Sequence, residues 1–253
     1  MTGVATLLDI NPDLDAPAYA KAYARDGVVR IANVLAPASA EAVARLLERE
    51  TAWRLTLSAA DNPKPDLYDA AQIQALGQQA LAGRLAVLAA EASAGFAYAY
   101  LSYPMIRAYI EGWDRGHPIH GLTEFLNSPP FLDLFRTVTG RPDVLKADAQ
   151  ATLYRPGDFL ALHDDGAADE SNSDRVCAYT FGFTRAWRPD WGGQLLFHDQ
   201  EGEIERGFAP AFNTLTLFQV PRPHSVAPVA PYAGAPRLSV VGWTRTDRPK
   251  SGN

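Results

Sequence analysis

The 253-residue chain has few cysteines and no long apolar run. Its single cysteine, Cys177, rules out an internal disulfide and fits a reducing compartment. No apolar stretch reaches the roughly 20 residues that span a bilayer, and the N-terminal Met1–Asp9 lacks the basic region of a signal peptide. We therefore expect a cytoplasmic protein with no membrane partner.

Basic residues are fewer than acidic ones. The chain has 23 Lys and Arg against 29 Asp and Glu, which gives a net charge of −6 and a pI near 5.4. This balance argues against a general nucleic-acid binder, which carries a basic stripe, and permits a basic protein or a cationic small molecule as partner. One group of acidic residues would form a rim over which a basic substrate approaches: Asp164, Asp169, Glu170 and Asp174.

The first half of the chain is mostly helical in pattern, and 253 residues suffice for one domain with a sizeable core. Apolar spacing and turn residues predict helices at Ala16–Arg25, Pro37–Thr51, Ala70–Ser93 and, in two pieces around Pro129-Pro130, His120–Thr139. Three β-branched or aromatic runs predict strands at Gly27–Val34, Trp53–Ser58 and Gly95–Ile106. A turn-rich break is expected at 61–66.

From Val144 onward, short β-rich runs alternate with Gly, Pro and Asp turns, which suggests a sandwich or a jelly roll. The expected strands are Leu145–Arg155, Phe159–His163, Arg175–Thr184, Gly193–Phe197, Glu203–Phe208, Thr214–Val220, Ser225–Val229 and Arg237–Arg245. No Gly-, Ser- or Pro-rich linker divides the halves, so we expect the helices to form a support layer on one sheet.

A candidate metal site begins with His163 and Asp165. Residues i and i+2 of a strand point to one face, so these two would aim together and Asp164 would aim away, although the sequence alone lets either carboxylate bind. His224, on a Pro-flanked corner, is the preferred third ligand, and His198 is its main competitor. Two histidines and a carboxylate are the facial triad of non-haem Fe(II), which leaves three positions open.

Arg237 lies on an apolar strand, where it shares one face with Ser239, Val241 and Trp243. If this face is internal, the guanidinium needs a counter-anion, because an unpaired buried charge is very costly. A bound dicarboxylic 2-oxo acid would supply it. For Tyr154, a core role and a cosubstrate role are about equally expected.

Other residues carry weaker signals. Arg175 opens a core strand near the expected mouth of the site and is a candidate substrate contact. The pair His117 and His120 is expected to serve a loop or a helix start rather than a metal. The tyrosines of the third strand are expected to give support packing: Tyr98, Tyr100 and Tyr103.

Two other classes of function remain. A nucleophilic hydrolase is disfavoured, because Cys177 lies within a strand and the chain has no Gly-x-Ser-x-Gly elbow. A metal-free or zinc-bound jelly-roll binding module remains the alternative, but it would not explain Arg237.

Residues 154–243 resemble the core of the prolyl-hydroxylase-like branch of the Fe(II)/2-oxoglutarate dioxygenases. The matching segments are Tyr154-x-x-Gly157-Asp158-Phe159-Leu160-x-x-His163-Asp164-Asp165, Arg175–Phe181, Trp191–Phe197, Pro223–Val226 and Arg237–Trp243. The His-Asp-Asp form is most similar to the ribosomal-protein prolyl hydroxylases and their bacterial relatives. Three positions depart from the family pattern: Phe181-Gly182 replaces a tyrosine pair of animal oxygen-sensing members, and Val241 replaces a hydroxyl residue.

This resemblance implies a role for each candidate residue. His163, Asp165 and His224 would bind iron and form the catalytic centre, while Arg237 and Tyr154 would bind 2-oxoglutarate. Ser239 and Trp243, on the Arg237 face, are counted with the cofactor-binding residues. The implied cofactors are Fe(II), 2-oxoglutarate as cosubstrate, O2 and, optionally, ascorbate.

The resemblance also implies a fold and a reaction. The expected fold is mainly β with helical support (α+β): a cupin-like double-stranded β-helix, or jelly roll, over 144–253, with a mostly helical layer over 1–143, in a single domain 1–253. The expected reaction is hydroxylation of an unactivated C–H bond. A prolyl residue of a protein is the first expectation for the substrate, and a free or carrier-bound amino acid or other small molecule is the alternative. The oligomeric state is left open.

Overall fold

The computed structural model describes residues 8–59, 64–166 and 174–248. Within these ranges the helices are α1 (Ala16–Asp26), α2 (Pro37–Arg49), α3 (Ala70–Leu76), α4 (Gln78–Ala92), α5 (Met105–Glu111), α6 (Pro118–Leu126) and α7 (Pro129–Thr139), with a 3-10 helix at Pro189–Trp191. The strands are β1 (Val28–Ala32), β2 (Arg54–Ala59), β3 (Asp66–Tyr68), β4 (Ala97–Tyr103), β5 (Lys146–Ala147), β6 (Gln150–Tyr154), β7 (Phe159–His163), β8 (Arg175–Phe183), β9 (Leu195–His198), β10 (Ile204–Phe208), β11 (Phe212–Gln219), β12 (His224–Val226) and β13 (Arg237–Arg245).

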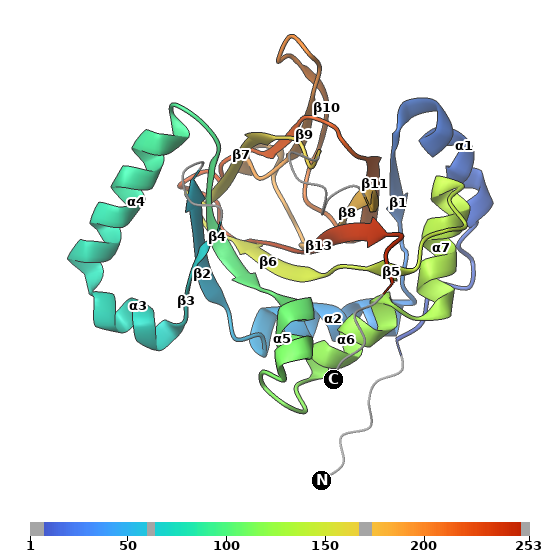
Figure 1. Cartoon of the computed structure of the whole chain (residues 1–253), viewed down its shortest axis with the longest axis horizontal. Helices are drawn as coiled ribbons and strands as arrows, with labels where there is room; N and C mark the ends of the chain where they lie inside the picture. Colours follow the sequence, from blue (N-terminus) through green and yellow to red (C-terminus); the bar gives the residue numbers. More distant parts are fainter. Residues whose placement is uncertain (1–7, 60–63, 167–173, 249–253) are drawn as a thin grey trace.

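The strands form one curled antiparallel sheet, which closes into a half-barrel (Figure 1). Its order is β1-β11-β8-β13-β6-β4-β7-β12-β9-β10, while β2 pairs with β3 and β4, and β5 pairs with β13. Strands from the first half of the chain therefore belong to the same sheet: β1 pairs with β11 at one edge, and β4 lies between β6 and β7. This pairing supports our proposal that residues 1–253 form a single domain.

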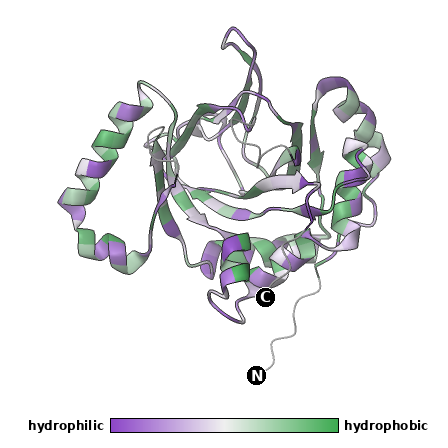
Figure 2. Cartoon of the chain, in the orientation of Figure 1, coloured by the Kyte–Doolittle hydropathy of each residue, from purple (hydrophilic) through white to green (hydrophobic). Residues whose placement is uncertain are grey.

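The helices cover the outer face of the half-barrel. Alternation along β13 sends Leu238 and Val240 into the helical layer, where they join a cluster of buried residues from α1, α2, α6 and α7. The ring of Phe131 from α7 lies 6.0 Å from that of Phe181 on β8. Figure 2 shows hydrophobic residues following the sheet-facing side of these helices, with hydrophilic ones at the tip of the β9–β10 hairpin. The predicted class, a mainly β core with helical support, is confirmed.

The prediction of one helix over Ala70–Ser93 is wrong. Gly77 adopts φ +80°, a conformation that only glycine takes readily, and it separates α3 from α4. The first piece has its own capping box, in which Asp69 and Gln72 bond each other's backbone N–H groups. The leucine spacing continues across the break, so periodicity alone joined the two helices.

Other departures are short elements. No separate sequence signal predicts α5, β3 or β5. The strand expected up to Ile106 ends at Tyr103, because Pro104 is the N-cap of α5. The expected break at 61–66 falls partly outside the described residues. In the part of the chain that is described, no helix is long and apolar enough to cross a membrane.

Candidate metal centre and cosubstrate pocket

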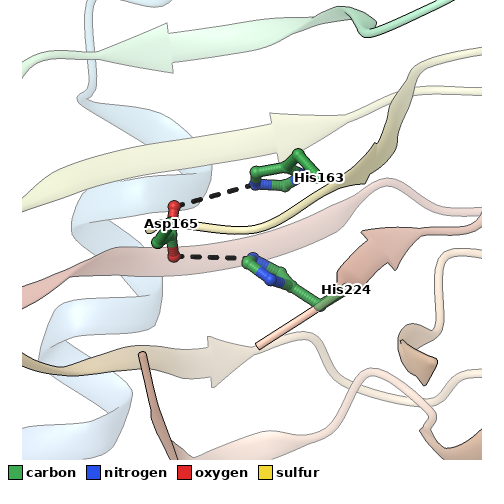
Figure 3. Close-up of side chains that lie close together, drawn as sticks. All are labelled: His163, Asp165 and His224. Carbon is green, nitrogen blue, oxygen red and sulfur yellow. Dashed lines mark ion pairs between the residues drawn. The ribbon is translucent and has the colours of Figure 1, made fainter. Parts of the chain in front are cut away.

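The two candidate histidines face each other across adjacent strands. His163 is the last residue of β7, His224 is the first of β12, and the two are register partners. Directly opposed residues of an antiparallel pair point to one face, so the imidazole rings lie together with centroids 4.2 Å apart. Figure 3 shows both rings turned toward the Asp165 carboxylate.

Asp165 completes a three-residue cluster. Its Oδ1 lies 3.8 Å from His163 Nε2, and its Oδ2 lies 3.6 Å from His224 Nε2. One ligand atom from each residue lies within 4.8 Å of the other two, a spacing that a single metal ion can bridge. The neighbouring Asp164 turns away, and its Oδ1 accepts a hydrogen bond from the Gly166 N–H at 2.9 Å.

The reason given for placing Asp165 needs correction. Asp165 lies beyond the end of β7, in a segment without regular structure, so strand alternation does not orient it. Its backbone is instead held by Arg175, whose Nη1 donates to the Asp165 carbonyl at 3.2 Å. The His-x-Asp spacing therefore predicted the correct carboxylate, but the backbone that places it is not the strand that the prediction assumed.

The donor set fits Fe(II). His163 Nδ1 lies 2.9 Å from the Ala161 carbonyl, and His224 Nδ1 lies 2.8 Å from the Arg222 carbonyl. A carbonyl accepts only from a protonated Nδ1, so each Nε2 keeps a free lone pair directed at the cluster. Burial and the nearby His163 together lower the pKa of His224 to about 4, although Asp165 acts to raise it. The cluster thus offers two imidazole nitrogens and a carboxylate, the ligands of the Fe(II) facial triad.

His198, the competitor, does not join this cluster. Its Nε2 bonds Ser225 Oγ at 2.9 Å, and its Nδ1 lies 3.4 Å from the Gly202 carbonyl. The pair His117 and His120 belongs to α6, as expected: His117 Nδ1 accepts from the Ile119 N–H at the helix start.

Arg237 is buried without a carboxylate. It is 3% exposed, and its guanidinium carbon lies 4.9 Å from the ring centroid of Tyr154, its register partner on β6. Its Nη1 has no hydrogen-bond partner, and no ion pair involves it within the described ranges. Burial lowers the pKa of Arg237, while Tyr154 raises it. A buried cation with an orphaned donor is a site built to receive an anion.

A stack of aromatic rings connects the arginine with the metal cluster. Tyr154 stacks on Tyr100 at 4.8 Å, and Tyr100 stacks on Tyr98 at 5.1 Å. Phe96 lies 5.6 Å from Tyr98 and 5.1 Å from the His163 ring. Tyr98 and Tyr100, expected to be support packing, thus lie in the chain of rings that runs from the arginine to the metal cluster; the aromatic residues alternating from position 96 were the available signal.

Tyr103 points the other way. It is buried against the helices, and its hydroxyl donates to Asp114 at 2.9 Å. The expectation of support packing holds for this tyrosine.

The remaining candidates lie at the two ends of β13. Ser239 lines a pocket with Arg237, and its hydroxyl is 2.8 Å from that of Thr152. Trp243 lies toward the opposite end of β13, with the guanidinium carbon of Arg175 3.8 Å from its ring centroid. Arg175 Nε and Trp243 Nε1 are both buried without a hydrogen-bond partner.

The acidic rim is described only in part. Asp164 follows β7, and Asp174 precedes β8. Asp174 Oδ2 lies 3.9 Å from Arg245 Nη2. Asp169 and Glu170 lie outside the described residues.

Comparison with known proteins agrees with this geometry. Residues 149–245 match the family model described as the 2OG-Fe(II) oxygenase superfamily. No curated protein matches the chain.

Solved structures share the fold at low sequence identity. A prolyl-4-hydroxylase of Pseudomonas putida aligns with TM-score 0.54 and 18% identity, covering 92% of this chain and 99% of that one. A 2OG-Fe(II) oxygenase family oxidoreductase of Burkholderia pseudomallei gives TM-score 0.58 and 15% identity, covering 93% of each chain. A Trichoplax adhaerens prolyl hydroxylase, solved with a peptide fragment of hypoxia inducible factor, gives 0.55 and 17%, covering 91% of this chain and 89% of that one.

The matched segment contains the metal cluster, the buried arginine and the strands that hold them. This segment is similar to the core of the 2OG-Fe(II) oxygenase superfamily and spans a little over a third of the chain. The fold is like that of the prolyl-hydroxylase neighbours, and the matched family implies Fe(II), 2-oxoglutarate and O2, which the His163–Asp165–His224 cluster fits.

Proposed function

We propose that this chain is a 2-oxoglutarate-dependent dioxygenase that hydroxylates a prolyl residue of a protein. The observation that carries the proposal is the pairing of two buried sites on one curled sheet: the His163–Asp165–His224 cluster and, at the far end of the aromatic stack, Arg237. Fe(II) bound by the cluster, with 2-oxoglutarate and O2, would supply the oxidising chemistry that breaks an unactivated C–H bond.

Arg237 and Tyr154 would hold 2-oxoglutarate by its distal carboxylate. The orphaned Nη1 of Arg237 supports this role, because a guanidinium pairs with a carboxylate through two parallel hydrogen bonds. Ser239, on the same face, would contribute a hydroxyl to the pocket, and Trp243 would close the end nearer Arg175. The stacked rings of Tyr98 and Tyr100 would keep water away from the cosubstrate.

The substrate would arrive from the β7 side of the cluster. The side chain of His163 is 18% exposed, against 6% for His224. Arg175 Nε and Trp243 Nε1 are two unpartnered donors near Asp165, suited to carbonyl oxygens of a peptide backbone. The peptide bound to the Trichoplax neighbour supports a protein substrate for a fold of this kind.

Mass spectrometry on proteins from cells with and without the gene tests the substrate. We expect a prolyl residue that gains one oxygen only when the gene is present, and that loses it when the gene carries Asp165→Ala. If no protein differs, and a free amino acid instead stimulates succinate formation by the purified chain, the substrate is a small molecule and the prolyl proposal is wrong.

A further inference from the structure

Arg237 is not the only arginine at its pocket. The small pocket at the inner end of the half-barrel is also lined by Arg30, which interrupts the apolar strand β1. Its other walls are hydroxyl-bearing and small residues of β8, β11, β13 and the loop that precedes β11, together with the apolar Leu195, Phe208 and Leu238, and no acidic residue lines it. The pocket therefore combines two guanidinium groups with no internal counter-charge.

The two arginines face the same interior. Directly opposed residues of antiparallel strands project to one face, as do residues two apart on a strand. One row of directly opposed residues crosses β1, β11, β8 and β13: Ala32, Thr214, Gly182 and Ser239. Arg30 lies two residues before Ala32 on β1, and Arg237 lies two residues before Ser239 on β13.

The two arginines differ in depth. Arg237 is 3% exposed, whereas Arg30 is only partly buried and therefore lies at the more exposed end of this pocket, which we call its mouth. Arg30 Nη2 donates to the Ala209 carbonyl at 2.8 Å, and its guanidinium carbon lies 5.3 Å from the Phe208 ring centroid. Within the described ranges it forms no ion pair, so no carboxylate compensates its charge.

We propose that Arg30 is a second anion-recognising residue of the cosubstrate pocket, which favours 2-oxo acids that carry a distal carboxylate. It acts as a positioning residue: its positive charge at the mouth attracts that carboxylate, and Arg237 receives it at the inner end. The inference rests on the proposed role of Arg237. A purely structural role is the competing explanation, in which Arg30 only ties the Ala209 loop to β1.

Arg30→Gln separates the two roles, because the amide can still donate to the Ala209 carbonyl but carries no charge. The full chain, loaded with Mn²⁺ so that no turnover occurs, is titrated calorimetrically with 2-oxoglutarate and with 2-oxopentanoate, which has the same carbon chain without the distal carboxylate. We expect the Kd for 2-oxoglutarate to rise on the order of fivefold at low salt, less at high salt, with little change for 2-oxopentanoate. The control is Arg136→Gln on α7, a partly buried arginine that also donates to a backbone carbonyl, that of Val144, and should leave both affinities unchanged.

Unchanged 2-oxoglutarate affinity in Arg30→Gln would overturn the inference, as would an equal loss for both acids, which a displaced loop would cause. Absence of 2-oxoglutarate binding to the unaltered chain would be a different failure. It would overturn the cosubstrate assignment itself, and this inference with it.

Discussion

His163 and His224 hold their positions through strand pairing, whereas Asp165 does not. The histidines are register partners, and the carbonyl two residues earlier in the chain orients each Nδ1. Asp165 depends on the segment after β7 and on the Arg175 hydrogen bond to its backbone. Metal affinity should therefore be sensitive to Arg175 as well as to the three ligands.

Replacing His224 by Ala should abolish Fe(II) binding, because only two of the three donors then remain. His198→Ala is the matched control: it removes a histidine of the neighbouring strand that bonds Ser225 instead. Bound metal per chain and succinate formation give the readouts. Full iron content in His224→Ala, with loss in His198→Ala, would show that the third ligand is His198.

Arg237→Lys should weaken 2-oxoglutarate binding markedly and leave Fe(II) binding nearly unchanged. Lysine keeps the charge but cannot form the bidentate pair with a carboxylate. Tyr154→Phe should cost less, on the order of 1 kcal/mol for one hydrogen bond. Binding of 2-oxoglutarate to each variant checks this, and an unchanged affinity in Arg237→Lys would refute the assignment.

At this scale the sequence predicted which residues meet but not how each is held. The spacing of His163 and Asp165 pointed to the cluster, and the apolar strand around Arg237 pointed to a buried cation. The stacking of Tyr100 on Tyr154 could not be predicted, because it depends on β4 pairing with β6, two strands that are distant in the sequence.

At the scale of elements, close backbone approach fixes β8 against the loop before β11. A Cβ on Gly182 would lie 2.4 Å from the Ala211 carbonyl oxygen. Gly182→Ala should therefore destabilise the fold by about 1–3 kcal/mol through overpacking, measured by denaturant unfolding. Gly83→Ala in α4, where nothing lies within 4 Å, should instead stabilise by about 0.5–1 kcal/mol. Equal stability of Gly182→Ala and the unaltered chain would mean that the loop yields easily.

The long strands were predictable because their patterns are strong, and the bounds of β7 and β13 agree with expectation. Short elements were not. A two-residue strand such as β5 has no periodicity to read, and its existence follows from pairing with the far end of β13. The split at Gly77 depends on one backbone angle that the apolar pattern does not encode.

At the scale of the whole molecule, composition and motif order predicted a mainly β fold with helical support. The same features could not give the strand order, since β1 and β4 join partners from the second half of the chain. Sequence also placed an acidic excess near the site but left its arrangement undetermined, with Asp169 and Glu170 outside the described residues.

A basic, Pro-containing peptide should bind better than a neutral one, because the chain carries a net charge of −6. Peptide affinity should fall as added salt shortens the Debye length below about 8 Å. Charge reversal at Asp169 and Glu170 should slow association more than it changes turnover. Stopped-flow binding at several salt concentrations tests this; equal rates for both peptides would remove the electrostatic account.

An anaerobic titration of the metal-free chain with Fe(II), with and without 2-oxoglutarate, tests the account most directly. The chain, Asp165→Ala and Asp164→Ala are compared for bound iron and bound 2-oxoglutarate. We predict one Fe(II) and one 2-oxoglutarate per chain for the unaltered protein and for Asp164→Ala, whose carboxylate faces away from the histidines. Asp165→Ala should hold neither tightly; if it binds both as well as the unaltered chain does, the cluster is not the iron site.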